Sequence, residues 1–338
     1  MNKMKKYLVT LNLLVVSLIT LGQDTAFNAE RSLSEVLITA NRSERKLGNI
    51  AVPVQLISQK TIRQTGSLRL QDILQEQTGL VIVNSSLGSA LNGYPNPFGQ
   101  GVQMLGLDPA YTLILLDGEP LIGRNGGILK LGRLSTGNIK QIEIVKGPSS
   151  SLYGSEAMAG VINIITLPPQ KENASFQLHH ATNNTWGTGL SYGNRFHKTG
   201  VQFFINRYSS SGYDLDKSIY GKTMDPWRDW SGQVKITHDF SNKLQLLISA
   251  RGFDSKQNND YRILWQGQNA VAKGYTSEKD QSGFLQVRWQ MKRDRKFYYR
   301  IFYDHYRNNS FVNLDKTTIR FDETSFNQSI LKPELQYE

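Results

Sequence analysis

The sequence predicts an α+β domain followed by antiparallel β-strands that span a membrane, and three observations support this. The chain opens with a basic and then apolar leader. Residues 35–166 mix short apolar runs with helix signals. From Ala174 onward the helix signals stop, and apolar and polar residues alternate with a period of two.

Residues 1–22 are predicted to be a signal peptide. Three lysines in the first six residues precede the apolar run Leu8–Leu21, and Thr20 and Gly22 supply the small residues of a cleavage site. The run is too short to span a membrane as a helix, and no stop-transfer charges follow it. The alternative, a buried helix of a soluble protein, leaves the lysines and the small residues unexplained. We therefore expect export.

Residues 35–166 predict a small mixed α/β domain. A helix is expected from Ser67 to Gln77, with Gly79 just past its end, and a smaller one from Ser58. Five short runs rich in β-branched residues or leucine are expected to be strands: Val54–Ile57, Leu80–Val83, Thr112–Leu116, Ile139–Val145 and Val161–Ile165.

The stretch GPSSSLYGSEAMAGVINIIT, residues 147–166, raises the question of a phosphate-binding loop. Gly147 and Gly154 are too far apart for a P-loop, and Ser155 stands where the P-loop has its lysine. We interpret the loop as structural, with glycines that permit positive φ and close backbone approach.

The second half of the chain predicts about eight amphipathic strands. In Gln281–Lys292, for example, Leu285, Val287 and Trp289 share one face, and Gln286, Arg288 and Gln290 share the other. The remaining predicted strands are Ala174–Ala181, Trp186–Asn194, Val201–Ser209, Trp230–Phe240, Lys243–Asp254, Lys296–Arg307 and a last segment from about Phe326.

Strand length and connection length favour membrane-spanning strands over a soluble β-sandwich. The strands are predicted to be about 9–12 residues long, near the length that crosses a bilayer at a tilt. Short connections (Asn183-Asn184, Ser241-Asn242, Arg293-Asp294) alternate with long ones (Ser210–Asp229, Ser255–Asp280, Asn308–Ser325), as in outer-membrane barrels. Aromatic residues near strand ends fit interfacial girdles: Tyr208, Trp230, Phe240, Phe253 and Tyr306.

Composition argues against several classes of function. The chain has no cysteine, and no H-E-x-x-H motif, paired carboxylates or nucleophile–histidine set is present. We therefore expect no enzyme activity, no catalytic residue, no metal site and no cofactor. The net charge is +11, but the charges alternate with apolar residues along strands, so nucleic-acid binding is not expected.

Three motifs, in order, resemble the TonB-dependent outer-membrane receptors, which have a plug domain followed by a 22-stranded barrel. Glu35–Arg42 (EVLITANR) looks like the energy-coupling box and first plug strand of the family's cobalamin receptor. Tyr111–Gly118 (YTLILLDG) matches the plug's central strand and turn. The closing plug signature is matched by Ile139–Gly147, Pro148, Leu152-Tyr153-Gly154 and Ala159–Thr166.

The resemblance implies four segments. They are a signal peptide (1–22), a tether (23–34), an energy-coupling segment and plug (35–168), and the N-terminal part of a transmembrane β-barrel (169–338). The tether spans at most roughly 40 Å, which is too short for a signalling domain. The predicted contact with a TonB-type periplasmic transducer is an extended segment that a partner's sheet edge can pair with: Glu35, Val36, Leu37, Ile38, Thr39 and Ala40.

The implied function is the active import of a scarce ligand, with a ferric siderophore as the leading candidate and cobalamin or haem as alternatives. Haem fits less well because no histidine lies between Leu33 and Thr166. The predicted ligand contacts are on plug loops: Tyr94, Asn96, Phe98, Arg124 and Asn125. The other expected partner is outer-membrane lipid. The glycine-rich loop is expected to be the plug's final turn, packed against the barrel wall, where bulky side chains would collide.

The chain departs from the family pattern in two ways. Met104-Leu105-Gly106 stands where relatives carry Arg-Gly, so one plug–barrel ion pair is expected to be lost or replaced. A 22-stranded barrel needs roughly 450 residues, and about eight strands cannot enclose a plug. We therefore expect an N-terminal fragment of a longer receptor, which at full length would be a monomeric barrel. A truncated inactive product and a secreted binding or adhesion module remain alternatives.

Overall fold

The computed structural model describes residues 37–38, 45–46, 53–84, 99–124, 127–169, 172–215, 222, 224–265, 268–292, 295–314 and 320–337. Residues 37–338 form one compact unit. Within it, an α+β domain precedes an eight-stranded antiparallel sheet. The predicted signal peptide (1–22) and tether (23–34) lie outside the described residues.

The α+β domain is built on a five-stranded sheet with the order β3-β8-β9-β6-β7. Strands β6 and β9 are parallel, and the other neighbours are antiparallel. The strands are β3 (Val54–Ser58), β6 (Thr112–Leu116), β7 (Glu119–Pro120), β8 (Ile139–Lys146) and β9 (Gly160–Thr166). Two further antiparallel pairs are β1 (Leu37–Ile38) with β2 (Arg45–Lys46) and β4 (Leu80–Asn84) with β5 (Gln100–Met104). The five strands predicted in this domain are confirmed to within a residue.

Two helices lie between β3 and β4. Helix α2 (Gln59–Thr65) begins as predicted at Ser58, whose hydroxyl accepts from the Thr61 amide at 3.2 Å. The predicted start of the next helix at Ser67 is wrong, because α3 (Leu70–Gln75) begins only after Arg69. Residues 67–69 contact the segment around Ser135 instead of capping the helix. The Ser67 carbonyl accepts from the Thr136 hydroxyl at 2.7 Å, and Arg69 forms an isolated antiparallel β-bridge with Ser135. The remaining helical turns are η2 (Pro109–Tyr111), η3 (Leu131–Arg133), η4 (Thr136–Asn138), α5 (Ser150–Tyr153) and η5 (Ser155–Ala157).

The apolar core lies inside the α+β domain. Ile142 of β8, Ile162 of β9 and Leu70 of α3 are each fully buried in one cluster, which continues through β4, β5 and η3. In the described part of the chain no helix has the length and apolar character needed to cross a membrane.

The glycine-rich loop has the positive φ angles that were predicted for it, +111° at Gly147 and +85° at Gly154. The predicted packing against a barrel wall is not seen at these two glycines, because a Cβ at either would meet nothing within 4 Å among the described residues. At Gly160 a Cβ would lie 2.2 Å from the Val145 carbonyl oxygen and 2.4 Å from Met104 Sδ. The tight packing is therefore internal to the α+β domain.

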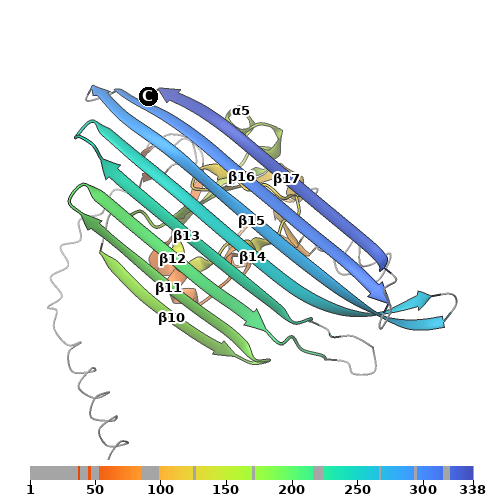
Figure 1. Ribbon diagram of the computed structural model, residues 1–338. Helices are drawn as coiled ribbons and strands as arrows, with labels where there is room; N and C mark the ends of the chain where they lie inside the picture. The colour runs from red at the N-terminus through yellow and green to blue at the C-terminus, as the bar shows by residue number, and fades with distance from the viewer. Residues whose placement is uncertain are drawn as a thin grey trace, which may run out of the picture. The chain divides into compact units, whose positions relative to one another are not determined.

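The second half forms one sheet in which β10 to β17 follow each other in order, all antiparallel (Figure 1). The prediction of eight strands is thereby confirmed. Their bounds are β10 (Asn173–Ala181), β11 (Thr185–Phe196), β12 (Thr199–Ser210), β13 (Trp227–Asp239), β14 (Leu244–Trp265), β15 (Gln268–Lys292), β16 (Arg295–Leu314) and β17 (Arg320–Tyr337).

The predicted strand lengths are wrong for the last four strands. Strands β14 to β17 have 22, 25, 20 and 18 residues, so most of the predicted long connections Ser255–Asp280 and Asn308–Ser325 continue the ladder. In these stretches the apolar residues no longer keep to the exposed face: Val312 and Leu314 of β16, for example, are buried. The two-residue alternation therefore does not continue through them. The prediction that the turn Asn183-Asn184 lies at the short-turn end of the sheet is also wrong. The Ser211 amide donates to the Asn183 carbonyl at 3.1 Å, so this turn lies at the same end as the long connection after β12.

The sheet has an apolar exposed face and a polar face that is buried. Phe176 and Leu331 are 71% and 68% exposed, whereas Asp280 and Asp304 on the other face are at most 1% exposed. This arrangement is the reverse of a soluble sheet and is expected of strands that face lipid. Three of the predicted girdle residues do not lie on the exposed face. Tyr208, Phe253 and Tyr306 lie beside cations of the α+β domain instead. Trp230 and Phe240 are exposed, as predicted.

Candidate functional site

The candidate functional site is the contact between the α+β domain and the polar face of the sheet. Charged side chains of the domain's loops meet charged side chains that point inward from β13 to β17. The ion pairs across this contact are Asp117–Lys235, Glu119–Arg300, Glu119–Lys332, Lys130–Asp229, Lys130–Glu278 and Arg133–Asp280.

Asp117 is placed by the tight turn between β6 and β7. It has φ +52° and is followed by Gly118 at +84°, so the chain reverses and the carboxylate points back across the sheet. One oxygen accepts from the Thr166 amide at 2.9 Å, and the other accepts from the Thr166 hydroxyl at 2.8 Å and pairs with Lys235 at 2.8 Å. Burial raises the pKa of Asp117, but Lys235 and Thr166 outweigh it and hold the pKa below its usual value. The carboxylate thus joins β6, the end of β9 and strand β13.

Arg133 is a deeply buried charge of the domain. Its side chain is 0% exposed, its Nε donates to Asp280 Oδ2 at 3.0 Å, and its Nη1 donates to the Ile122 carbonyl at 2.7 Å. The guanidinium also lies 4.7 Å from the Tyr306 ring centroid. Arg251 of β14 pairs with the same Asp280 oxygen. Burial lowers the pKa of Arg133, but Asp280 and Glu278 raise it above its ordinary value, so Arg133 is charged at every accessible pH.

Lys130 and Glu119 each pair with two charged side chains of the sheet. The Lys130 ammonium lies 3.4 Å from Asp229 and 3.7 Å from Glu278 and contacts the Ser255 hydroxyl. Glu119 is 3% exposed, and its two oxygens separately meet Arg300 at 2.8 Å and Lys332 at 3.0 Å.

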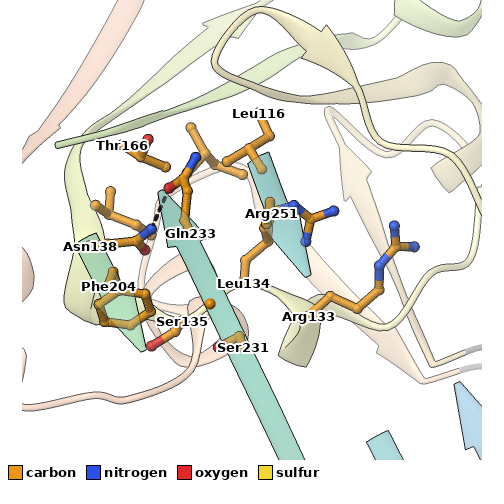
Figure 2. A pocket seen from close by; sticks show the side chains of 13 residues that line it. Leu116, Arg133, Leu134, Ser135, Asn138, Thr166, Phe204, Ser231, Gln233 and Arg251 are labelled. Carbon is orange, nitrogen blue, oxygen red and sulfur yellow. Dashed lines mark hydrogen bonds between the residues drawn. The ribbon is translucent and has the colours of Figure 1, made fainter. Parts of the chain in front are cut away.

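A small cavity lies in the same interface. It holds about 20 Å³, room for about one water molecule. Figure 2 shows Asn138 of η4 facing Gln233 of β13 at its edge, joined by a 2.7 Å hydrogen bond, with Arg133 and Arg251 farther along the lining. A second cavity of about 320 Å³ lies between Asp117 and Glu119 of the domain and Lys235 and Arg300 of the sheet, so the contact is polar and only partly packed.

Among the described residues, the apolar core cluster lies within the α+β domain and does not extend into the sheet. Ion pairs and hydrogen bonds are directional, and water can replace each of them once the surfaces part. An apolar contact of the same area would resist opening because it exposes surface that water solvates poorly. Charged and hydrogen-bonding contacts therefore carry much of the attachment of the domain to the sheet.

Most residues predicted to contact a transducer or ligand lie outside the described residues. Of the predicted transducer segment, Leu37 and Ile38 are described and form β1, which pairs with Lys46 and Arg45 of β2. Glu35, Val36, Thr39 and Ala40 lie outside, as do the predicted ligand contacts Tyr94, Asn96, Phe98 and Asn125. Contact of these residues with a transducer or ligand stays a prediction.

Arg124 is described, and its side chain is only 10% exposed. Its Nη2 donates to the carbonyls of Pro109, Ala110 and Thr112 at 3.2–3.4 Å, and its Nη1 pairs with Glu156 at 3.3 Å. Burial lowers the pKa of Arg124, and Glu156 opposes that shift. These contacts give Arg124 a role in joining loops of the domain, and contact with a ligand stays a prediction.

Sequence reasoning missed the interface residues of the α+β domain. Asp117, Lys130, Arg133 and Asn138 lie in turns and short helices, and Glu119 lies in the two-residue strand β7, where a polar or charged residue normally indicates solvent. A usable signal is present on several of the predicted strands, whose polar faces carry isolated charges such as Lys235, Arg251 and Arg300. A buried polar face demands partners.

Comparison with known proteins agrees with this architecture. Residues 46–161 match the family described as TonB-dependent Receptor Plug Domain. The fold resembles the ferric enterobactin receptor of Pseudomonas aeruginosa, solved as a mutant with enterobactin, at 13% identity and a TM-score of 0.50, covering 85% of this chain and 60% of that one. It also resembles the ferric-catecholate import receptor Fiu of E. coli K12, at 15% identity and a TM-score of 0.61, covering 86% of this chain and 43% of that one.

A third similar structure is the FpvAI–pyocin S2 complex, at 9% identity and a TM-score of 0.59, covering 89% of this chain and 52% of that one. The chain thus spans about half the length of the solved proteins it resembles. At these identities the likeness concerns the fold. The family match covers the α+β domain, and the structural likeness extends through most of the chain. The chain therefore carries the plug domain of the TonB-dependent receptors, followed by an eight-stranded sheet that matches part of their barrel.

Proposed function

We propose that this protein acts as an outer-membrane receptor that actively imports a ferric siderophore with energy from a TonB-type periplasmic transducer. TonB-dependent receptors are outer-membrane proteins that transport without catalysing a reaction. The observation that carries the proposal is the plug itself, which is tied by buried ion pairs to the polar face of a sheet whose other face is apolar and exposed.

The proposed mechanism is the release of the plug by force. The outer membrane has neither ATP nor a useful ion gradient, so energy must arrive mechanically from the periplasm. A partner strand that pairs with Glu35–Ala40 would pull on the chain ahead of β3. Because β3 pairs with β8, and β8 begins next to η3 and η4, tension would reach the loops that carry Arg133 and Asn138.

A siderophore is favoured over the other ligands by two facts. Two of the similar structures are described as receptors for ferric enterobactin and ferric catecholates. The plug segment from Leu33 to Thr166 has no histidine, the side chain most suited to binding haem iron. The predicted ligand loops are those around Tyr94–Phe98 and Arg124-Asn125.

The test uses uptake and surface binding in a deletion strain of the source organism that expresses the full chain. Ferric siderophores, haem and cobalamin are offered separately. Substitution Ile38→Pro removes a backbone donor that strand pairing requires, so we expect uptake to stop while binding persists; the matched control Ile38→Val keeps both. Uptake that survives Ile38→Pro would exclude transducer-driven import, and binding without any uptake in the parent chain would indicate a secreted or surface binding module.

A further inference from the structure

The exposed face of the sheet contains a groove of about 500 Å³ over β12 to β15. Its apolar lining includes Ile205, Trp230 and Val234, which are 38%, 43% and 37% exposed. These side chains point away from the plug, because the residues that alternate with them, such as Asp229, Gln233 and Lys235, are buried against it. The groove therefore opens on the face that the fold presents to lipid.

Two glycines that lack side chains meet in the lining of the groove. Gly232 of β13 and Gly252 of β14 lie directly opposite each other in register. A Cβ at Gly252 would meet nothing within 4 Å, and its backbone lies outside the left-handed region. Neither backbone conformation nor crowding requires glycine at this position, so a side chain here would be accommodated and would fill the groove.

Cations lie just beyond one end of the groove. The register aligns Arg207, Trp230, Asp254, Lys279 and Arg307 in one row across β12 to β16. The adjacent row, farther from the groove, adds Arg228 and Lys256. The two rows together carry five cations and one carboxylate, Asp254, all on the exposed face toward the long connection between β12 and β13.

The reach of these side chains is compatible with a shared anionic group. The Arg207 guanidinium lies over the Trp230 ring, 5.6 Å from its centroid, so it leans from β12 across β13. Neighbouring strands are about 4.8 Å apart, which leaves two strand spacings between that guanidinium and the Lys279 backbone. A lysine side chain spans most of the remaining gap, so a phosphate between them would touch both. The register places Asp254 of β14 between Trp230 and Lys279, and its carboxylate opposes phosphate binding there.

We propose that this groove binds one acyl chain of an anionic, phosphate-bearing lipid whose headgroup phosphate lies between Arg207 and Lys279. The apolar groove and the cationic rows adjoin each other, which matches the two chemically different ends of such a lipid. Free inorganic phosphate has no part that fits the groove, and a zwitterionic lipid brings a second, repelled cation to the rows. The inference uses the membrane location of the receptor family and does not depend on the imported ligand or on the transducer.

The test measures contact quenching of Trp230 by lipids with brominated acyl chains. The full chain is reconstituted in mixed bilayers, and the Trp230 signal is the difference between the parent chain and Trp230→Phe. Brominated phosphatidylglycerol is compared with brominated phosphatidylcholine at one ionic strength, and inorganic phosphate is added in a third arm. We expect roughly a fivefold preference for phosphatidylglycerol, as one uncompensated cation near a surface provides, and no competition by millimolar inorganic phosphate.

Three variants and one control decide the matter. The double variant Arg207→Gln/Lys279→Gln should abolish the preference, Asp254→Asn should increase it, and Gly252→Leu should reduce quenching by both lipids by filling the groove. Lys243→Gln, which removes one cation next to the turn at the opposite end of the sheet, should change nothing. A preference unaltered in the double variant, or quenching unaltered in Gly252→Leu, would overturn the proposal. Unchanged plug protection from protease in each variant shows that the fold is kept.

Discussion

Replacing Arg133 with methionine should be the most damaging single substitution at the plug–sheet contact. Methionine is apolar and of similar length, so it keeps much of the packing while removing the charge and all donors. The substitution leaves the Ile122 carbonyl without its 2.7 Å donor and removes one of the two guanidinium partners of Asp280. It also removes the cation that faces Tyr306.

The size of the effect follows from these losses. Breaking a buried ion pair by removing one partner costs about 3–5 kcal/mol, but Arg251 still pairs with Asp280, which places the expected loss at the lower end. An unsatisfied buried carbonyl adds about 1–3 kcal/mol, and the apolar gain from methionine offsets part of it. We expect Arg133→Met to lower the free energy of unfolding by about 3 kcal/mol.

The assay is denaturant-induced unfolding of the purified full chain in detergent, followed by near-ultraviolet circular dichroism and by protease sensitivity of the plug. The matched control is Arg195→Met, which breaks the Arg195–Asp239 pair, whose side chains are each 29% exposed. An exposed pair of this kind contributes at most about 1 kcal/mol. If the two substitutions cost the same, the buried pair does not hold the plug to the sheet, and the reasoning about this interface is refuted.

Two other predictions concern single residues of the plug. The pKa of Asp117 is held low in the folded chain, so its stabilising contacts are fully present above the unfolded pKa of about 3.9 and are lost as the pH falls below it. The difference in melting temperature between Asp117→Asn and the parent chain should therefore be largest near pH 7 and shrink toward pH 3. A difference that stays constant or widens on acidification contradicts this. Gly160→Ala should prevent stable folding, because its Cβ would lie 2.2 Å from the Val145 carbonyl oxygen. Gly147→Ala has open space around it and should cost only about 1–3 kcal/mol of backbone strain. Equal yields of folded protein from the two variants would argue against the packing described for β9.

The elements of this protein could be predicted from its sequence because their signals are local. The short apolar runs of the plug gave strands correct to within a residue, and the Ser58 cap gave the start of α2. The two-residue alternation from Ala174 onward gave the number of sheet strands and, through residues such as Val234 and Lys235, the two faces of each. Backbone geometry and side-chain parity fix these features over a few neighbouring residues.

The tertiary structure alone decided how long the sheet strands are and what holds the plug. Strands β14 to β17 are longer than the apolar alternation indicates, because backbone pairing continues where that alternation stops. Arg133 and Asp280 are 147 residues apart, and each taken alone is an ordinary charged residue of a turn or a strand. Their pairing depends on how the domain packs against the sheet, and no local pattern in the sequence records which charges will meet across that contact.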